Sequence, residues 1–228
     1  MTSTIEPYYH DEAAGITIYH GRCEDVLPTL DAATVDLVLT DPPYGMSNNC
    51  DYTRLSTGPR GTGGRSRRSY DQIEGDDRPF DPAPWLGFPR VILFGSNHFG
   101  AHLPVGTTLV WIKRFDGGFG SYLSDAEVAW MKGGHGVYCH RDTSMQSVGR
   151  KGEKVHPTQK PVGLMKWCIA KSKAPNDVMI LDPFMGSGTT LLAAKGMGLR
   201  AIGIECHEPY AEIAAQRLSQ QVLALGAD

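Results

Sequence analysis

A motif of one acid, two prolines and an aromatic ring, DPPY, follows the apolar run VDLVL near the amino end of the chain. Proline disfavours helix in the residue before it and has no amide hydrogen. Asp41 and Pro42 are therefore expected to be extended, and Pro43 occupies no nearby acceptor. The Asp41 carboxylate and the Pro42 carbonyl can then accept both hydrogens of a nucleobase amino group, while Tyr44 stacks on the base. An amine bound in this way could attack a sulfonium methyl group directly. The alternative is a turn with a helix-capping acid.

A second motif, LDPFMGSGTT at residues 181–190, contains two glycines that permit a tight turn before a helix. Glu205 ends the following strand, at the place where doubly wound folds hold ribose hydroxyls. The third glycine of the dinucleotide fingerprint and the lysine of the phosphate-binding loop are both absent. A nucleoside joined to an amino acid, as in S-adenosylmethionine, therefore fits better than a dinucleotide, with Asp182 opposing the ammonium. The alternative for the glycine turn is a purely structural entry into the helix, and the alternative for Glu205 is a solvated acid.

The elements around these motifs alternate between strands and helices. Apolar runs bounded by turn residues predict strands at 15–21, 35–41, 90–97, 107–114, 177–182 and 200–205. Helices are predicted at 161–173, 188–198 and about 209–225. This alternation predicts an α/β fold of the doubly wound type, with a mostly parallel sheet covered by helices on both faces. Ligands bind such sheets beyond the carboxyl ends of the strands, where both motifs lie.

Composition indicates a single domain spanning residues 1–228, with 41% hydrophobic residues available for a core. No apolar run approaches the roughly 20 residues of a membrane span, and no signal peptide precedes the domain, so we expect a cytoplasmic protein without a membrane partner. The five cysteines lie far apart, and the histidines lack metal-ligand spacing. We therefore assign no metal and no disulfide.

Two segments are expected to be inserts that contact DNA. The first, 46–79, is rich in arginine and glycine although the net charge of the chain is −3, and the second is 113–155. Trp130 and Tyr138 in the second insert are more typical of core packing than of base stacking. The candidate DNA contacts are Arg54, Arg60, Arg65, Arg67, Arg68, Lys113 and Arg141. The alternative for the arginine segment is a disordered, solvated loop.

Together the motifs resemble those of the amino-directed DNA methyltransferases of the permuted β class, in which DPPY precedes the glycine motif as it does here. The segment HPTQKPVGLMKWCI at 156–169 is also similar to this class. The resemblance implies a Rossmann-like methyltransferase fold with permuted motif order, S-adenosylmethionine as donor, and a target base rotated out of double-stranded DNA. It implies that Asp41, Pro42, Pro43 and Tyr44 are catalytic. Residues implied to bind the cofactor are Asp182, Pro183, Phe184, Gly186, Ser187, Gly188 and Thr189, with Glu205 on the ribose and Thr158 and Lys160 on the methionine carboxylate.

One position departs from the family pattern. Relatives carry an acid that approaches the cofactor's adenine, and Arg22 stands in its place. Asp25 is a candidate substitute for the cofactor contact, although a helix cap is its alternative role. The chain also contains no separate target-recognition domain, so recognition is expected to come from the inserts.

The target of the reaction is narrowed by chemistry and by the resemblance. Asp41 before the prolines favours the N6 amine of adenine in similar enzymes, and the N4 amine of cytosine is the alternative. RNA, a protein glutamine amide and an inactive nucleic-acid-binding relative are further alternatives. Methylation of the cytosine ring carbon is excluded because no Pro-Cys nucleophile motif is present. The DNA recognition sequence, a paired restriction enzyme and a homodimeric assembly are left open by the sequence.

We expect the triple substitution of Arg65, Arg67 and Arg68 by alanine to lower DNA affinity and to make its salt dependence shallower. Each lost phosphate contact removes about one counterion from the slope of log affinity against log salt. Fluorescence anisotropy with labelled duplex DNA across a salt series measures both quantities. An unchanged slope would mean that the segment is only a solvated loop.

Overall fold

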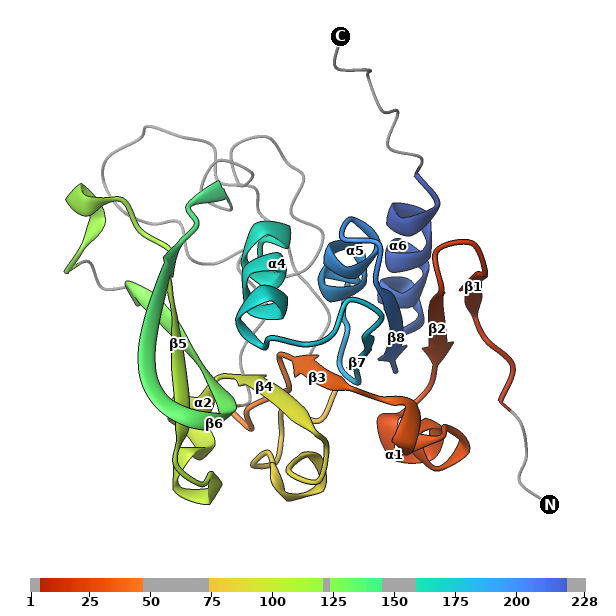
Figure 1. The fold of residues 1–228 in the computed structure, drawn as a ribbon, viewed down its shortest axis with the longest axis horizontal. Helices are drawn as coiled ribbons and strands as arrows, with labels where there is room; N and C mark the ends of the chain where they lie inside the picture. The colour runs from red at the N-terminus through yellow and green to blue at the C-terminus, as the bar shows by residue number, and fades with distance from the viewer. Residues whose placement is uncertain (1–4, 47–73, 121–123, 145–158, 221–228) are drawn as a thin grey trace, which may run out of the picture.

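The computed structural model describes residues 5–46, 74–120, 124–144 and 159–220. Within these ranges, strands form one sheet in the order β1-β2-β8-β7-β3-β4-β6-β5 (Figure 1). The strands are β1 (Tyr9–Asp11), β2 (Ile16–His20), β3 (Leu37–Thr40), β4 (Arg90–Phe94), β5 (Gly106–Ile112), β6 (Ala126–Arg141), β7 (Met179–Asp182) and β8 (Arg200–Glu205). The α-helices are α1 (Cys23–Val26), α2 (Ser96–Phe99), α4 (Val162–Lys171), α5 (Thr189–Lys195) and α6 (Glu208–Ser219).

The centre of the sheet is parallel, as the sequence predicts. Strands β2, β8, β7, β3 and β4 run in one direction, whereas β1 pairs antiparallel with β2 and β6 pairs antiparallel with β4. All four residues of β3 are buried, which is expected of a strand covered on both faces. The carboxyl ends of the parallel strands therefore meet at one edge, where ligands bind in sheets of this kind.

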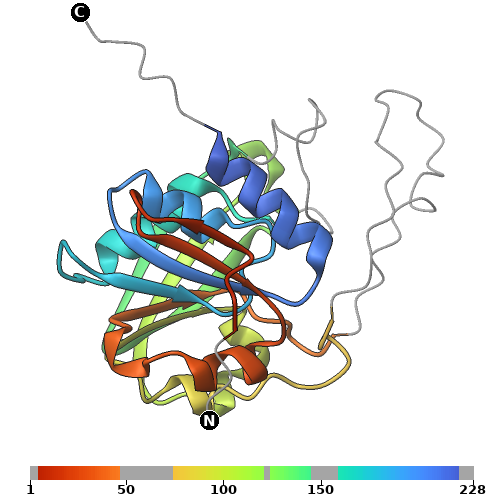
Figure 2. The same ribbon diagram turned by 90° about the vertical axis from the view of Figure 1, so that its right-hand side faces the viewer.

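Two apolar clusters cover the two faces of the sheet. On one face α4, α5 and α6 pack on the sheet through residues such as Leu164, Leu191 and Ala211 (Figures 1 and 2). On the other face the covering elements are short, and their main apolar contributions are Trp85 from the 3-10 helix Ala83–Trp85 and Phe99 from α2. The predicted helices on both faces are confirmed, although those on the second face are brief.

Strand β6 lies within the segment 113–155, which the sequence analysis interpreted as an insert that contacts DNA. Its residue Trp130 pairs with Leu93 of β4, so this part of the segment belongs to the core. The first half of β6 pairs with β5 in the antiparallel sense, from Gly106 with Lys132 to Ile112 with Ala126. The second half pairs with β5 in the parallel sense, from Thr108 with Val137 to Ile112 with Arg141. Strand β5 therefore lies between the two halves of β6, which curves around it in Figure 1. The sequence analysis did not predict this strand, because the glycine-rich run in the middle of β6 is not typical of a strand.

Several further boundaries differ from those expected. Strand β1 was not predicted, because its three residues are too few to show a period. Helix α6 is described to Ser219, and the rest of the predicted helix at 209–225 lies largely outside the described residues. No helix in the described part of the chain is long and apolar enough to cross a membrane.

We expect Trp130→Ala to lower the free energy of unfolding by about 3 to 5 kcal/mol, because its side chain is 6% exposed and its removal leaves a cavity. Its indole also loses the hydrogen bond that it donates to the Pro104 carbonyl. Tyr138→Ala in the same strand is the control, since that ring is 46% exposed and contacts mainly Lys171; we expect a cost below about 1 kcal/mol. Urea denaturation compares the two, and equal losses would contradict the core role of β6.

Candidate active site

A cavity of about 600 Å³ lies at the carboxyl ends of β2, β3, β7 and β8. Each of these strands places a residue on its wall: Gly21 after β2, Asp41 after β3, Asp182 at the end of β7 and Glu205 at the end of β8. The cavity thus joins the two sequence motifs in one site. Among the residues predicted to bind a cofactor, those that line it are Lys160, Asp182, Pro183, Phe184, Gly186, Ser187, Thr189 and Glu205.

Asp41 has hydrogen-bond donors on both carboxylate oxygens. The Tyr44 hydroxyl donates to Oδ1, and the Lys160 ammonium donates to Oδ2. The Lys160 side chain is only 5% exposed and the Asp41 side chain 18%. Charges buried to this degree are costly unless they are paired, so the ion pair stabilises an ionised carboxylate at the cavity wall. Each carboxylate oxygen has a further lone pair with which it can accept another donor.

The pKa values of this pair follow from burial and from the neighbouring charges. Burial raises the pKa of Asp41, and the Lys160 ammonium opposes that effect. Burial lowers the pKa of Lys160, but the carboxylates of Asp41 and Glu127 raise it more, and it lies well above the usual lysine value. Lys160 is therefore a permanent cation beside Asp41. The family resemblance implies that Lys160 binds a methionine carboxylate, and in the structure its partners are the carboxylates of Asp41 and Glu127.

Tyr44 is held in place from three sides. Its ring stacks on His98 with centroids 4.7 Å apart and an interplanar angle of 13°. Gly95 has a φ of 72°, and a Cβ at this position would lie 2.0 Å from Cε1 of the Tyr44 ring. Asp76 accepts hydrogen bonds from the amide of Tyr44 and from those of the next two residues, at 2.9 to 3.1 Å. Sequence reasoning missed Asp76 and Gly95, because neither lies in a recognisable motif.

The glycine loop after β7 is held by backbone and side-chain hydrogen bonds. Asp182 accepts from the Thr40 hydroxyl at 2.7 Å, which connects the ends of β7 and β3. Burial raises the pKa of Asp182 to about 6.

The glycine loop also packs against α6. Gly188 has a φ of 75°, and a Cβ there would lie 2.8 Å from that of Ala214 in α6. Arg217 of α6, which the sequence analysis did not identify, donates to the carbonyl and hydroxyl of Ser187. Gly188 does not line the cavity, and its lack of a side chain lets α6 pack closely against the loop.

Glu205 contributes to both the loop and the cavity wall. One carboxylate oxygen accepts from the Gly186 amide at 2.8 Å, and the other accepts from the His207 amide at 2.9 Å. Burial raises the pKa of Glu205, and these backbone donors oppose the effect. The side chain fixes the turn and still faces the cavity, where its remaining lone pairs can accept ligand hydroxyls.

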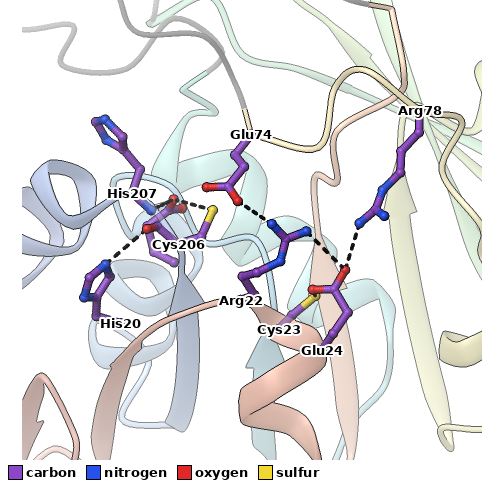
Figure 3. Close-up of polar contacts among 9 residues, drawn as sticks. His20, Arg22, Cys23, Glu24, Glu74, Arg78, Cys206 and His207 are labelled. Carbon is purple, nitrogen blue, oxygen red and sulfur yellow. Dashed lines mark hydrogen bonds and ion pairs between the residues drawn. The ribbon is translucent and has the colours of Figure 1, made fainter.

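An ion-pair cluster lies at the rim of the cavity (Figure 3). The Arg22 guanidinium lies 2.5 Å from a Glu74 oxygen and 3.9 Å from Glu24, and Arg78 lies 3.0 Å from the same Glu24 oxygen. All four side chains are roughly half exposed, so each pair contributes at most about 1 kcal/mol. Arg22 thus brings two carboxylates to a position where relatives carry one acid.

Asp25 is the one described candidate for cofactor binding, apart from Gly188, that does not line the cavity. It lies in the first turn of α1 and is exposed, whereas its neighbour Glu24 faces the cavity. Successive residues of a helix point in different directions, which accounts for the difference between Asp25 and Glu24, and a cofactor contact of Asp25 stays a prediction. Asp25 caps no helix through its side chain either, because Arg22 is the N-cap residue of α1.

The expected DNA contacts have varied positions. Lys113 is 27% exposed and pairs with Glu127 at 2.8 Å, and its contact with DNA stays a prediction. Arg141 is 45% exposed and pairs with Asp116 at 2.7 Å, which leaves it accessible. Five candidate arginines, Arg54, Arg60, Arg65, Arg67 and Arg68, and the cofactor candidate Thr158 lie outside the described residues.

Sequence comparison finds proteins that are similar to this chain. Residues 110–216 match the family model N6_N4_Mtase, which is described as DNA methylase. The chain is also 27% identical over 265 residues to the type II methyltransferase M2.LlaDCHI of Lactococcus lactis subsp. cremoris, an alignment that covers 94% of this chain and 93% of that protein. The chain is therefore similar in sequence to the DNA methylases.

Solved structures of DNA methylases share the fold. The M1.HpyAVI complex with SAM has a TM-score of 0.58 and 21% identity, covering 89% of this chain and 99% of that one. The PvuII DNA methyltransferase, which is named cytosine-N4-specific, has a TM-score of 0.58 and 14% identity, covering 96% of this chain and 91% of that one. The chain thus has the Rossmann-like methyltransferase fold that its sequence predicts.

We expect Gly95→Ala to lower methyl transfer by about tenfold to a hundredfold, because the new Cβ would displace the Tyr44 ring that contacts Asp41. The positive φ of Gly95 adds strain for any other residue. Gly87→Ala is the matched control, since a Cβ there has open space around it. Turnover with tritiated cofactor and thermal unfolding are measured for both variants. Wild-type turnover in Gly95→Ala would contradict the role of this close contact.

Proposed function

We propose that this protein is a DNA methylase that transfers a methyl group from S-adenosylmethionine to the N6 amine of adenine in double-stranded DNA, after rotation of the base out of the helix. The observation that carries the proposal is the position of Asp41, an ionised carboxylate on the wall of the cavity that Asp182 and Glu205 also line. An acceptor for an amine therefore lies beside the residues suited to the methyl donor.

The residues of the cavity fit S-adenosylmethionine. Asp182 and Glu205 offer carboxylates for its ammonium and its ribose hydroxyls, and Phe184 and Trp85 offer apolar ring faces. Within the volume of about 600 Å³ there is room for a molecule of this size. When bound, the cofactor would supply an electrophilic sulfonium methyl group; its transfer to the amine nitrogen would release S-adenosylhomocysteine as the leaving group and one amine proton to solvent.

The DPPY motif supplies the groups that would activate the amine. Asp41 and the Pro42 carbonyl accept its two hydrogens, which draws the nitrogen lone pair out of conjugation with the ring. Electrostatic groups already in place need no reorganisation during the reaction, and such preorganisation is commonly the largest contribution to catalysis. Tyr44 lies next to Asp41, where its ring would pack on the target base.

Adenine is favoured over cytosine by the acid at Asp41, as the resemblance to adenine-directed relatives implies. The N4 amine of cytosine is the alternative, and the likeness of fold to the PvuII enzyme, whose name is cytosine-N4-specific, keeps it in consideration. The relative M2.LlaDCHI is named a type II methyltransferase, which favours a role in restriction-modification. DNA contacts are proposed for Arg141 and for the arginine segment within 46–79.

We expect Asp41→Ala to lower methyl transfer about a hundredfold or more, because the principal acceptor for the target amine is removed. Asp177→Ala is the control, since that exposed acid precedes β7 at the opposite end of the strand from Asp182. The assay uses saturating S-adenosylmethionine, mixed-sequence duplex DNA, and a tritium label resolved into adenine and cytosine after digestion. Near-normal turnover in Asp41→Ala would disprove the catalytic role. Label in cytosine would retain the mechanism and change the base.

A further inference from the structure

A row of alternating charges leads away from Asp41 and extends beyond the residues that the proposed function uses. Lys160 contacts Asp41 and lies 3.1 Å from Oε2 of Glu127. The other oxygen of Glu127 lies 2.8 Å from the ammonium of Lys113. The order is therefore Lys113, Glu127, Lys160 and Asp41, with two cations balancing two anions. We define these four residues as the charge row.

The charge row is carried by the sheet. Glu127 is the second residue of β6, and the Val128 carbonyl next to it accepts from the Gly95 amide at 2.9 Å. Lys113 follows β5, and its amide donates to the Asp125 carbonyl at 3.2 Å. Because β6 is paired with both β4 and β5, the backbone that carries Glu127 is fixed relative to Asp41. Glu127 therefore has a defined position from which to act on Lys160.

Lys160 is shared between two carboxylates, and this sharing controls how strongly it binds Asp41. An ammonium has three donors, so it can serve Glu127 and Asp41 together. Burial raises the pKa of Glu127, but the two lysines outweigh it, and that pKa falls to about 2. Glu127 thus stays ionised wherever the enzyme is assayed. Its charge raises the pKa of Asp41, whereas Lys160 lowers it.

We propose that Glu127 is a positioning residue for methyl transfer. It shares the Lys160 ammonium with Asp41, which weakens the ion pair between Lys160 and Asp41 and so keeps Asp41 a strong acceptor for the target amine. This inference rests on the proposed function, since it requires that Asp41 bind the amine. Without Glu127, the cation would be drawn entirely to Asp41, and the acceptor strength of the carboxylate would fall.

The charges around Asp41 make opposite predictions for two variants. The groups that face it are Tyr44, Lys160 and, more remotely, Glu127 and Asp182. Glu127→Gln removes an anion, so Asp41 ionises more readily and the acidic limb of the activity profile moves to lower pH. Lys113→Met removes a cation, so the limb moves to higher pH. We expect shifts of about half a pH unit or more, because nearby charges change a carboxyl pKa on this scale.

The measurement is kcat/KM for duplex DNA against pH, with tritiated S-adenosylmethionine at saturation and the full chain. The plateau of Glu127→Gln is expected to fall by about tenfold to a hundredfold, since Lys160 and Asp41 are displaced from their positions. Glu127→Asp keeps the charge and should return the limb toward that of the wild type. Glu212→Gln on the exposed face of α6 is the matched control, and its limb should not move.

Each outcome separates this inference from the proposed function. Opposite shifts in Glu127→Gln and Lys113→Met support it, because damage to the fold alone would not reverse sign between the two. If Glu127→Gln fails to fold, Lys113→Met and Glu127→Asp still decide the question through the position of the limb. Unmoved limbs, or shifts in the same direction, overturn the inference alone. Absence of methyl transfer by the wild type overturns the proposed function as well.

Discussion

Parallel pairing between β3 and β7 is the constraint on which the rest of the site depends. The ladder joins Leu37 to Ile180 and Val38 to Leu181, so that both strands end at the same edge of the sheet. The hydroxyl of Thr40 then reaches Asp182 at 2.7 Å, although the two residues are 142 positions apart in sequence. The two motifs share one cavity because a parallel ladder leaves their strands no other relative direction.

Placing carboxylates at the end of buried strands is costly, and the structure offsets that cost at each one. Asp41 is paired with Lys160, Asp182 accepts from the Thr40 hydroxyl, and Glu205 accepts from two backbone amides. A buried acid with such partners stays ionised or close to it, whereas an isolated one would take up a proton. The same partners hold the side chains in fixed orientations, which is what transition-state stabilisation requires.

The DPPY motif is held rigid in two ways, by its own prolines and by residues that are distant in sequence. The prolines restrict the backbone locally, whatever the fold around them. The position of Tyr44 depends on residues distant in sequence, since Asp76 fixes its amide and His98 covers its ring. The motif therefore presents a backbone shaped by its own residues and a ring positioned by the fold. The contact of Tyr44 with Asp41 results from both.

The sequence by itself determined the α/β fold, the parallel sheet and the two motifs, because period, proline and glycine act on the chain over a few residues. The strand RAIGIE was predicted with its observed bounds, and Glu205 at its end lines the cavity, as expected of a residue at the carboxyl end of a strand. Only the tertiary structure decided that β6 belongs to the sheet, that Lys113 pairs with Glu127, and that Asp25 faces away from the cavity. These outcomes depend on which strands become neighbours. The partner of a charge is chosen by distance in space, which local sequence patterns do not encode.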